Sequence, residues 1–220
     1  MKNLKKILIL AAYCVITGTA LTSCLDSDGN YLTTREMTDI EKAKYLTEIA
    51  GEYSGMVVHT YLDRNEKAYA DTVKNVSWEI YQDKTIEIED LPDAMFWRYM
   101  KSGDDITEAT KNSTTKSNLE LTIAGMFTQQ YTDGTVYSNY FALDGKNKEH
   151  KFDIIRNEDG TDISYPVTVK FADSGRYGFS IGALDTSKKN ISMQLILSGV
   201  KVDNTEQKSD EAIWFIGKKL

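Results

Sequence analysis

The chain has 220 residues, of which 41% are hydrophobic and 27% are charged, and this composition excludes disordered, collagen-like and coiled-coil proteins. It carries 26 Lys and Arg against 33 Asp and Glu, and residues 1–23 hold three of the lysines and no acid. The rest of the chain therefore has 23 basic and 33 acidic groups, and a net charge of −10 repels nucleic acid as a partner.

Residues 1–23 have the three parts of a secretion signal. A basic start with three lysines precedes the apolar run 7–16, and small and polar residues follow at 17–20. The apolar run is shorter than the roughly 20 residues that a membrane-spanning helix needs. We therefore predict a cleaved signal peptide over residues 1–23 rather than a permanent span.

The signal ends in Leu21-Thr22-Ser23-Cys24, which resembles the bacterial lipobox. The resemblance implies that a lipoprotein signal peptidase cleaves before Cys24 and that its sulfur is diacylated; the alternative is a chance Cys beside an ordinary cleavage site. Two or more acyl chains hold a protein stably at a bilayer. Because Cys14 is lost with the leader and Cys24 carries lipid, this predicts a mature domain without disulfides or free thiols.

Residues 24–37 are predicted to be the lipidated Cys and a flexible tether, since they are polar and lack periodicity. Leu25 follows the Cys where an Asp would retain some lipoproteins at the inner membrane. Asp26 and Asp28 resemble the export signal of surface lipoproteins in the Bacteroidetes, although the acids of that signal are more often adjacent. The resemblance implies an outer-membrane lipoprotein, exposed on the cell surface in preference to the periplasmic face.

The remaining segment, 38–220, is predicted to form a single β-rich globular domain that begins with one amphipathic helix. Thr38-Asp39-Ile40-Glu41 matches the capping box of a helix N-terminus, and Gly51 suits the left-handed position after the last turn. The pattern predicts a helix that packs against a sheet through apolar residues spaced three or four apart, namely Ile40, Ala43, Leu46, Ile49 and Ala50.

After Gly51 the apolar residues alternate with a period of two, which is typical of strands. Asp133-Gly134 and Asp159-Gly160 indicate tight hairpins. The pattern predicts a mainly β fold, an antiparallel β-sandwich or barrel with the N-terminal helix and one short inserted helix, and a weak internal duplication remains an alternative. The expected strands are 53–62, 75–80, 85–89, 119–123, 135–141, 151–155, 166–171, 176–181, 191–202 and 211–216.

The inserted helix is expected over residues 90–100, with Pro92 near its start. It is apolar on nearly every side, and two interpretations follow. The favoured one is a plug over an open end of the sheet, and the other is a ligand or partner surface. The residues that would form such a surface are Met95, Phe96, Trp97 and Tyr99, and the polar stretch 101–118 that follows is expected to be a mobile loop.

No catalytic motif is present, and no cofactor or metal site is predicted. His59 lies on an alternating strand face and is expected to be packed, whereas His150 is expected in a solvated turn. The Asp- and Gly-rich stretches 26–30 and 157–162 do not complete an EF-hand pattern. Paired carboxylates for glycan hydrolysis remain an alternative, although 33 acids make some pair inevitable.

Binding is therefore the predicted function, with a glycan or a protein as the partner. Tyrosines at 53, 61, 69, 131, 137 and 140 offer flat amphipathic faces. Asp71-Thr72-Val73 resembles an O-glycosylation acceptor of Bacteroidetes envelope proteins, which would place a glycan on Thr72. Gly51-Glu-Tyr-Ser-Gly55 is similar to the first strand of lipocalin-like members of the small Bacteroidetes lipoproteins with domains of unknown function. Alternatives are an envelope glycan hydrolase, or a structural subunit that assembles by strand addition through 212–216.

Overall fold

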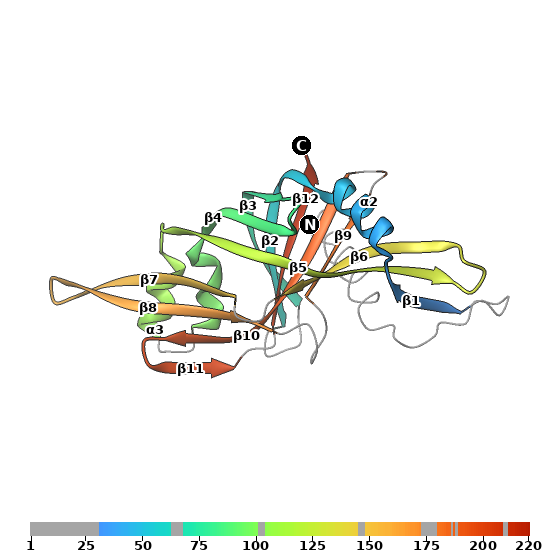
Figure 1. Ribbon diagram of the computed structural model, residues 1–220. Coiled ribbons are helices and arrows are strands. Elements are labelled where there is room, and N and C mark those ends of the chain that lie inside the picture. The colour runs from blue at the N-terminus through green and yellow to red at the C-terminus, as the bar shows by residue number, and fades with distance from the viewer. Residues whose placement is uncertain are drawn as a thin grey trace.

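The structure is a computed structural model that describes residues 31–62, 68–100, 104–144, 148–172, 180–185, 187, 189–208 and 211–220. The predicted signal peptide and Cys24 lie outside these residues. Figure 1 shows the arrangement of the elements, which in chain order are β1 (Leu32–Glu36), α2 (Asp39–Ile49), β2 (Gly51–Leu62), β3 (Ala68–Ile80), β4 (Thr85–Pro92), η1 (Asp93–Tyr99), α3 (Asp104–Lys111), β5 (Lys116–Tyr131), β6 (Val136–Asp144), β7 (Glu149–Glu158), β8 (Thr161–Phe171), β9 (Ile181–Asp185), β10 (Asn190–Val202), β11 (Thr205–Lys208) and β12 (Ala212–Lys219).

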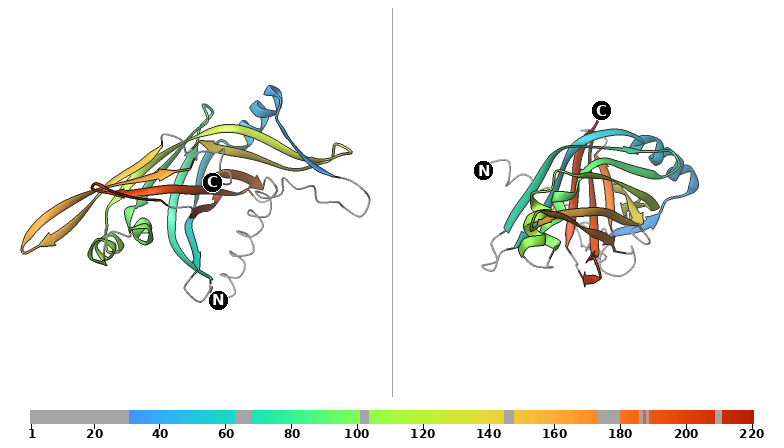
Figure 2. Two further views of the ribbon diagram at one scale, coloured as in Figure 1. Left: turned by 90° about the horizontal axis from the view of Figure 1, so that it is seen from below. Right: turned by 90° about the vertical axis from the view of Figure 1, so that its left-hand side faces the viewer.

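Eight of the strands form a ring of antiparallel pairings. Their order is β12-β2-β3-β4-β5-β6-β9-β10, and β10 pairs back onto β12. The right-hand view in Figure 2 shows these strands curving around a common interior. The predicted fold class, mainly antiparallel β, is therefore confirmed, and the closure corresponds to the barrel alternative.

Strand β10 belongs to two sheets. Its first half pairs with β9 and β12 in the ring, and its second half pairs with β8 and β11 in a lateral sheet that also contains β7. The register shifts between Leu197 and Gly199, where the strand passes from one sheet to the other. Such a bulge bends a strand and increases its twist, which lets one strand serve both sheets.

The interior of the ring is filled by large apolar side chains. Trp78 stacks on Tyr53 with ring centroids 5.8 Å apart and meets Phe215 edge-on at 6.1 Å. Gly217 leaves room for this indole, because a Cβ there would lie 2.3 Å from the Trp78 Cη2 atom. Other buried residues around this interior are Val57, Val76, Ile80, Ile86, Ile88, Leu119, Leu121, Ile123, Phe141, Leu143, Ile191, Met193, Leu195 and Ile213.

Helix α2 covers the end of the ring at which β2 begins. The predicted capping box is present, with Thr38 and Glu41 bonded to each other's backbone N–H. The buried side chains are Tyr45, Leu46 and Ile49. The expectation that Ile40 faces the sheet is wrong, since its side chain is 85% exposed. The direction in which a short helix docks is set by its tertiary contacts, here the Tyr45 ring against Phe141 and the Tyr53 hydroxyl bonded to the Ile49 carbonyl.

Two segments that were expected to be irregular are ordered. Leu32–Glu36, assigned to the tether, pairs with the end of β5 as strand β1, so pairing rather than burial stabilises it. Residues 104–111 of the expected loop form α3, and Lys116 begins β5. Helix α3 packs on the core through Ile106 and Ala109, which are too few apolar residues to give a clear sequence pattern.

The two Asp-Gly hairpins are confirmed. Gly134 and Gly160 have φ of 88° and 86°, in the region that glycine adopts at no steric cost. Strand β11 was not predicted, and the expected strand 176–181 is described only from Ser180 onward. Within the described residues, no helix combines the length and the hydropathy that crossing a membrane requires.

Candidate binding site at the rim of the ring

The short helix η1 lies at the end of the ring opposite α2. Pro92 precedes it with φ of −65°, which suits a helix N-terminus, and the helix is of the 3₁₀ type. Side chains three apart are eclipsed in such a helix, so Asp93, Phe96 and Tyr99 share one face, and all three are buried. Trp97 lies on another face and stays partly exposed.

The last turn of η1 reaches three strands of the ring. The Tyr99 ring packs on the His59 ring of β2 at 4.7 Å. His59 Nε2 lies 2.7 Å from Glu211 Oε2, just before β12, and the Arg98 guanidinium donates to Asp71 of β3. We name these five residues, His59, Asp71, Arg98, Tyr99 and Glu211, the rim cluster.

Among the residues that the structure describes, the buried Tyr99 hydroxyl has no hydrogen-bond partner. The side chain is only 4% exposed. Burial raises the pKa of Tyr99, and the nearby carboxylates of Glu211 and Asp71 raise it further while Arg98 opposes them, so the phenol keeps its proton. A buried hydroxyl without a partner costs about 1–3 kcal/mol, and an ordered water or a ligand oxygen is the usual remedy.

Trp97 extends the rim cluster toward α3. The Arg98 guanidinium carbon lies 4.2 Å from the centre of the indole, and Lys111 Nζ of α3 lies 5.3 Å from it. Cations at these distances interact favourably with the π face of the ring. The half-buried indole therefore lies beside two cations, one of which, Arg98, is paired with Asp71 of the cluster.

A buried acid–histidine pair fixes the start of η1. Asp93 Oδ1 lies 3.3 Å from His150 Nε2 and accepts from Ser117 Oγ at 2.8 Å, and Asp93 Oδ2 accepts from Thr115 Oγ1 at 2.7 Å. Burial opposes ionisation of this carboxyl, but the hydrogen bonds from His150, Thr115 and Ser117 outweigh it and hold the pKa of Asp93 below its usual value. The charged hydrogen bonds tie η1 to β5 and β7 and so position the rim cluster.

The expectation that His150 lies in a solvated turn is wrong. Its side chain is 1% exposed, between the rings of Phe96 and Phe152 at 5.1 and 5.5 Å. The alternation of His150, Phe152 and Ile154 along β7 was the signal that this histidine faces the core. His59 is buried on the inner face of β2, as expected.

The other residues predicted to form sites are distributed over η1, β3, β12 and the 157–162 turn. Met95, Phe96 and Tyr99 are buried, which is the packing expected of a plug, and Trp97 is half-buried. Thr72 is exposed on β3, as a modification site must be. Both edges of β12 are paired, with β2 and with β10, so this strand offers no edge for strand addition. In the 157–162 turn, Asn157 Nδ2 donates to Asp162 Oδ1 and the Gly160 N–H donates to Asn157 Oδ1.

A family model described as a domain of unknown function, DUF4840, matches residues 48–202. The match starts in the last turn of α2 and ends with β10, and it covers more than half of the chain. No significant match is found among curated proteins or among solved structures. The chain therefore belongs to the DUF4840 family, a domain of unknown function.

Proposed function

We propose that this protein is a lipid-anchored binding module of the bacterial cell envelope that holds a glycan at the rim cluster. One observation carries the proposal: among the described residues, the buried hydroxyl of Tyr99 has no hydrogen-bond partner, and it lies beside the Arg98–Asp71 ion pair and the His59–Glu211 hydrogen bond. Buried polar groups are almost always satisfied, so an unsatisfied one at a rim marks where a ligand acceptor fits.

The chemistry around Tyr99 suits a sugar. The carboxylates of Asp71 and Glu211 accept hydrogen bonds from hydroxyl groups, the Arg98 guanidinium donates them, and the Trp97 indole offers an apolar face. A protein partner is the other predicted class, because Trp, Tyr and Arg are also enriched in protein interfaces. The isolated hydroxyl favours the glycan, which has acceptors close to its apolar face.

Replacing Tyr99 with Phe separates binding from folding. Because the hydroxyl has no partner in the free protein, Tyr99→Phe is expected to leave the free energy of unfolding unchanged or to raise it by up to about 1 kcal/mol. The same change should weaken glycan binding about tenfold, the value of one hydrogen bond. The purified domain, residues 25–220, is screened on a glycan array, and affinities for the glycans found are measured by calorimetry.

Tyr81→Phe is the matched control, since its hydroxyl bonds Glu87 on the surface of β4, far from the rim cluster. It should bind glycan like the wild type. An array on which the wild-type domain binds nothing, or equal affinities for Tyr99→Phe and wild type, would contradict the proposal.

A glycan hydrolase is the alternative function, because it needs two carboxylates. Asp71 and Glu211 are both close enough to Tyr99 to raise its pKa. Each of these carboxylates already has a partner, Asp71 in an ion pair with Arg98 and Glu211 in a hydrogen bond with His59, and this arrangement favours binding over turnover. Release of reducing sugar that disappears in Glu211→Gln would reverse this preference.

The lipid anchor has its own test. Cys24→Ala is expected to move the protein from the membrane fraction to the soluble fraction and to slow its cleavage, because the acyl chains carry the attachment. Cell fractionation and intact mass measure both effects, and protease accessibility of whole cells distinguishes the surface from the periplasmic face. Ser27→Ala, three residues beyond Cys24, should change none of these, and membrane retention of Cys24→Ala would refute the anchor.

A further inference from the structure

A long hairpin projects from the ring at the end that α2 covers. It consists of the ends of β5 and β6, and β1 pairs along its outer edge from Glu36 opposite Phe127 to Leu32 opposite Tyr131. Figure 1 shows this arm on the right of the molecule, with the hairpin of β7 and β8 on the left. The described chain therefore starts at the tip of the arm, with Tyr31 beside the 132–135 turn.

Exposed apolar side chains flank the polar 132–135 turn at the tip of the arm. Tyr31, Val136 and Tyr137 are 43%, 54% and 46% exposed, and they are three of the seven large hydrophobic residues that are exposed in the described part of the chain. Tyr131 meets Tyr137 edge-on at 5.9 Å. Apolar residues that gather at one tip mark a contact surface, whereas single exposed ones do not.

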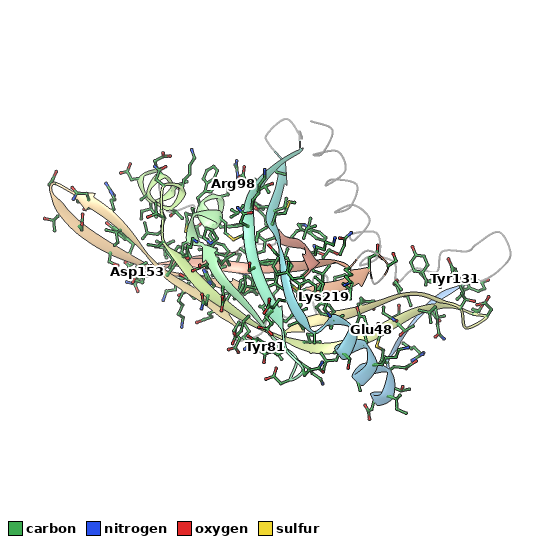
Figure 3. The ribbon with its side chains drawn as sticks, turned by 90° about the horizontal axis from the view of Figure 1, so that it is seen from above. Glu48, Tyr81, Arg98, Tyr131, Asp153 and Lys219 are labelled. Atoms are coloured by element: carbon green, nitrogen blue, oxygen red, sulfur yellow. The ribbon has the colours of Figure 1, made fainter. Side chains whose placement is uncertain are left out.

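The short length of chain between Cys24 and Tyr31 indicates that the bilayer lies next to this tip. Seven residues cannot span more than about 25 Å, whatever their conformation. If Cys24 carries the lipid, the tip is the part of the described structure that is held closest to the bilayer. Figure 3 places Tyr131 on the arm and Asp153 of β7 at the other side of the molecule, and Arg98 of the rim cluster also lies away from the arm.

We infer that the tip of the arm, formed by Tyr31, Tyr131, Val136 and Tyr137, inserts into the interfacial region of the bilayer as a second contact beside the lipid anchor. Tyrosine prefers this region because its ring is apolar and its hydroxyl reaches water. Residues 126–140 contain no Lys or Arg, so attraction to anionic lipid is not the driving force. The contact should therefore form on neutral lipid and resist salt. This inference rests on the proposed lipidation of Cys24.

The two Asp-Gly-Thr turns give a matched pair of reporter sites. Thr135 follows the turn of the arm and Thr161 follows the turn of the β7–β8 hairpin, and both are exposed. Since Cys14 is lost with the leader and Cys24 carries lipid, Thr135→Cys or Thr161→Cys introduces the single thiol for an environment-sensitive fluorophore. The lipidated full chain is reconstituted into phosphatidylcholine vesicles, and quenching by lipids with spin labels at known depths is measured.

The fluorescence emission of the label at position 135 is expected to shift to the blue and to be quenched by the shallow spin label, at low and at high salt. The emission of the label at position 161 is expected to remain that of a label in water. Adding Val136→Asp and Tyr137→Asp should abolish the signal at 135 while the protein still floats with the vesicles. Equal, aqueous signals at both positions in floating protein would overturn the inference and leave the anchor intact. Protein that does not float with the vesicles would overturn both the lipid anchor and the membrane contact of the arm. A label at position 135 that responds to glycan or to protein concentration, and not to lipid, would overturn the membrane contact alone.

Discussion

Deleting residues 209–220, and with them β12, is expected to leave the chain unfolded at 25 °C. Strand β12 joins β10 to β2, so its loss opens the ring and exposes two unpaired edges. It also removes Ile213 and Phe215 from the core and Trp214 from its contact with Val58. Losing each such side chain costs about 3–5 kcal/mol, and the sum matches the whole stability of about 5–15 kcal/mol of a typical domain.

Circular dichroism during thermal unfolding checks this result, with a cooperative transition for the complete domain and none for the truncated one. The matched control replaces β11, residues 205–208, by a Gly-Ser stretch of equal length, because its side chains are exposed or half-buried and it lies at a sheet edge. A synthetic 209–220 peptide added to the truncated chain should restore part of the signal. A truncated chain that melts cooperatively would show that closure of the ring is dispensable.

Asp93→Asn is expected to lower the free energy of unfolding at pH 7 by about 2–4 kcal/mol, because it removes one partner of a buried, charged network. The effect should depend on pH. The pKa of Asp93 is lowered from its ordinary 3.8 in the folded state, so its contribution is present above about pH 5 and is lost as the pH falls through the folded value. Wild type and variant should therefore converge only as the pH falls below the folded pKa of Asp93, which lies under 3.8.

Urea unfolding at pH 7, 5, 3.5 and 2.5 measures this dependence. Asp153→Asn is the matched control, since Asp153 lies on β7 close to His150 in sequence but is exposed. It should change the stability by less than about 0.5 kcal/mol at each pH. A loss of stability in Asp93→Asn that stays constant from pH 7 to 2.5 would show that packing, not the charge of Asp93, stabilises η1.

Short sequence motifs predicted the helix start and the turns better than they predicted which elements pack against each other. The capping box at Thr38 and the glycines at 134 and 160 act within a few residues, and the structure has each of them in the predicted role. The exposure of Ile40 and the pairing of Leu32–Glu36 depend on residues of β5 and β6 that lie about 90 or more positions away. No local pattern encodes such distant contacts, and the sequence therefore predicted the fold class but left sandwich and barrel as alternatives.

The same distinction holds at the rim. The sequence predicted a plug or a binding surface in η1 because the segment is apolar on nearly every side, but the groups around Tyr99 come from β2, β3 and the residue before β12. His59 and Glu211 are 152 positions apart, and Asp93 and His150 are 57 apart. The composition of the sequence supplies many acids, so only the folded topology shows which of them meet a histidine or an arginine.

Strand β10 gives the molecule a fixed length. Its 13 residues run from the ring to the lateral sheet, about 41 Å along the strand at 3.4 Å per residue, and bend at the bulge between Leu197 and Gly199. Both edges of each half are paired, with β9 and β12 in the ring and with β8 and β11 in the lateral sheet, so the strand fixes the two sheets relative to each other. In the proposed lipid-anchored form, a ligand at the rim cluster would therefore be held at a constant distance from the arm.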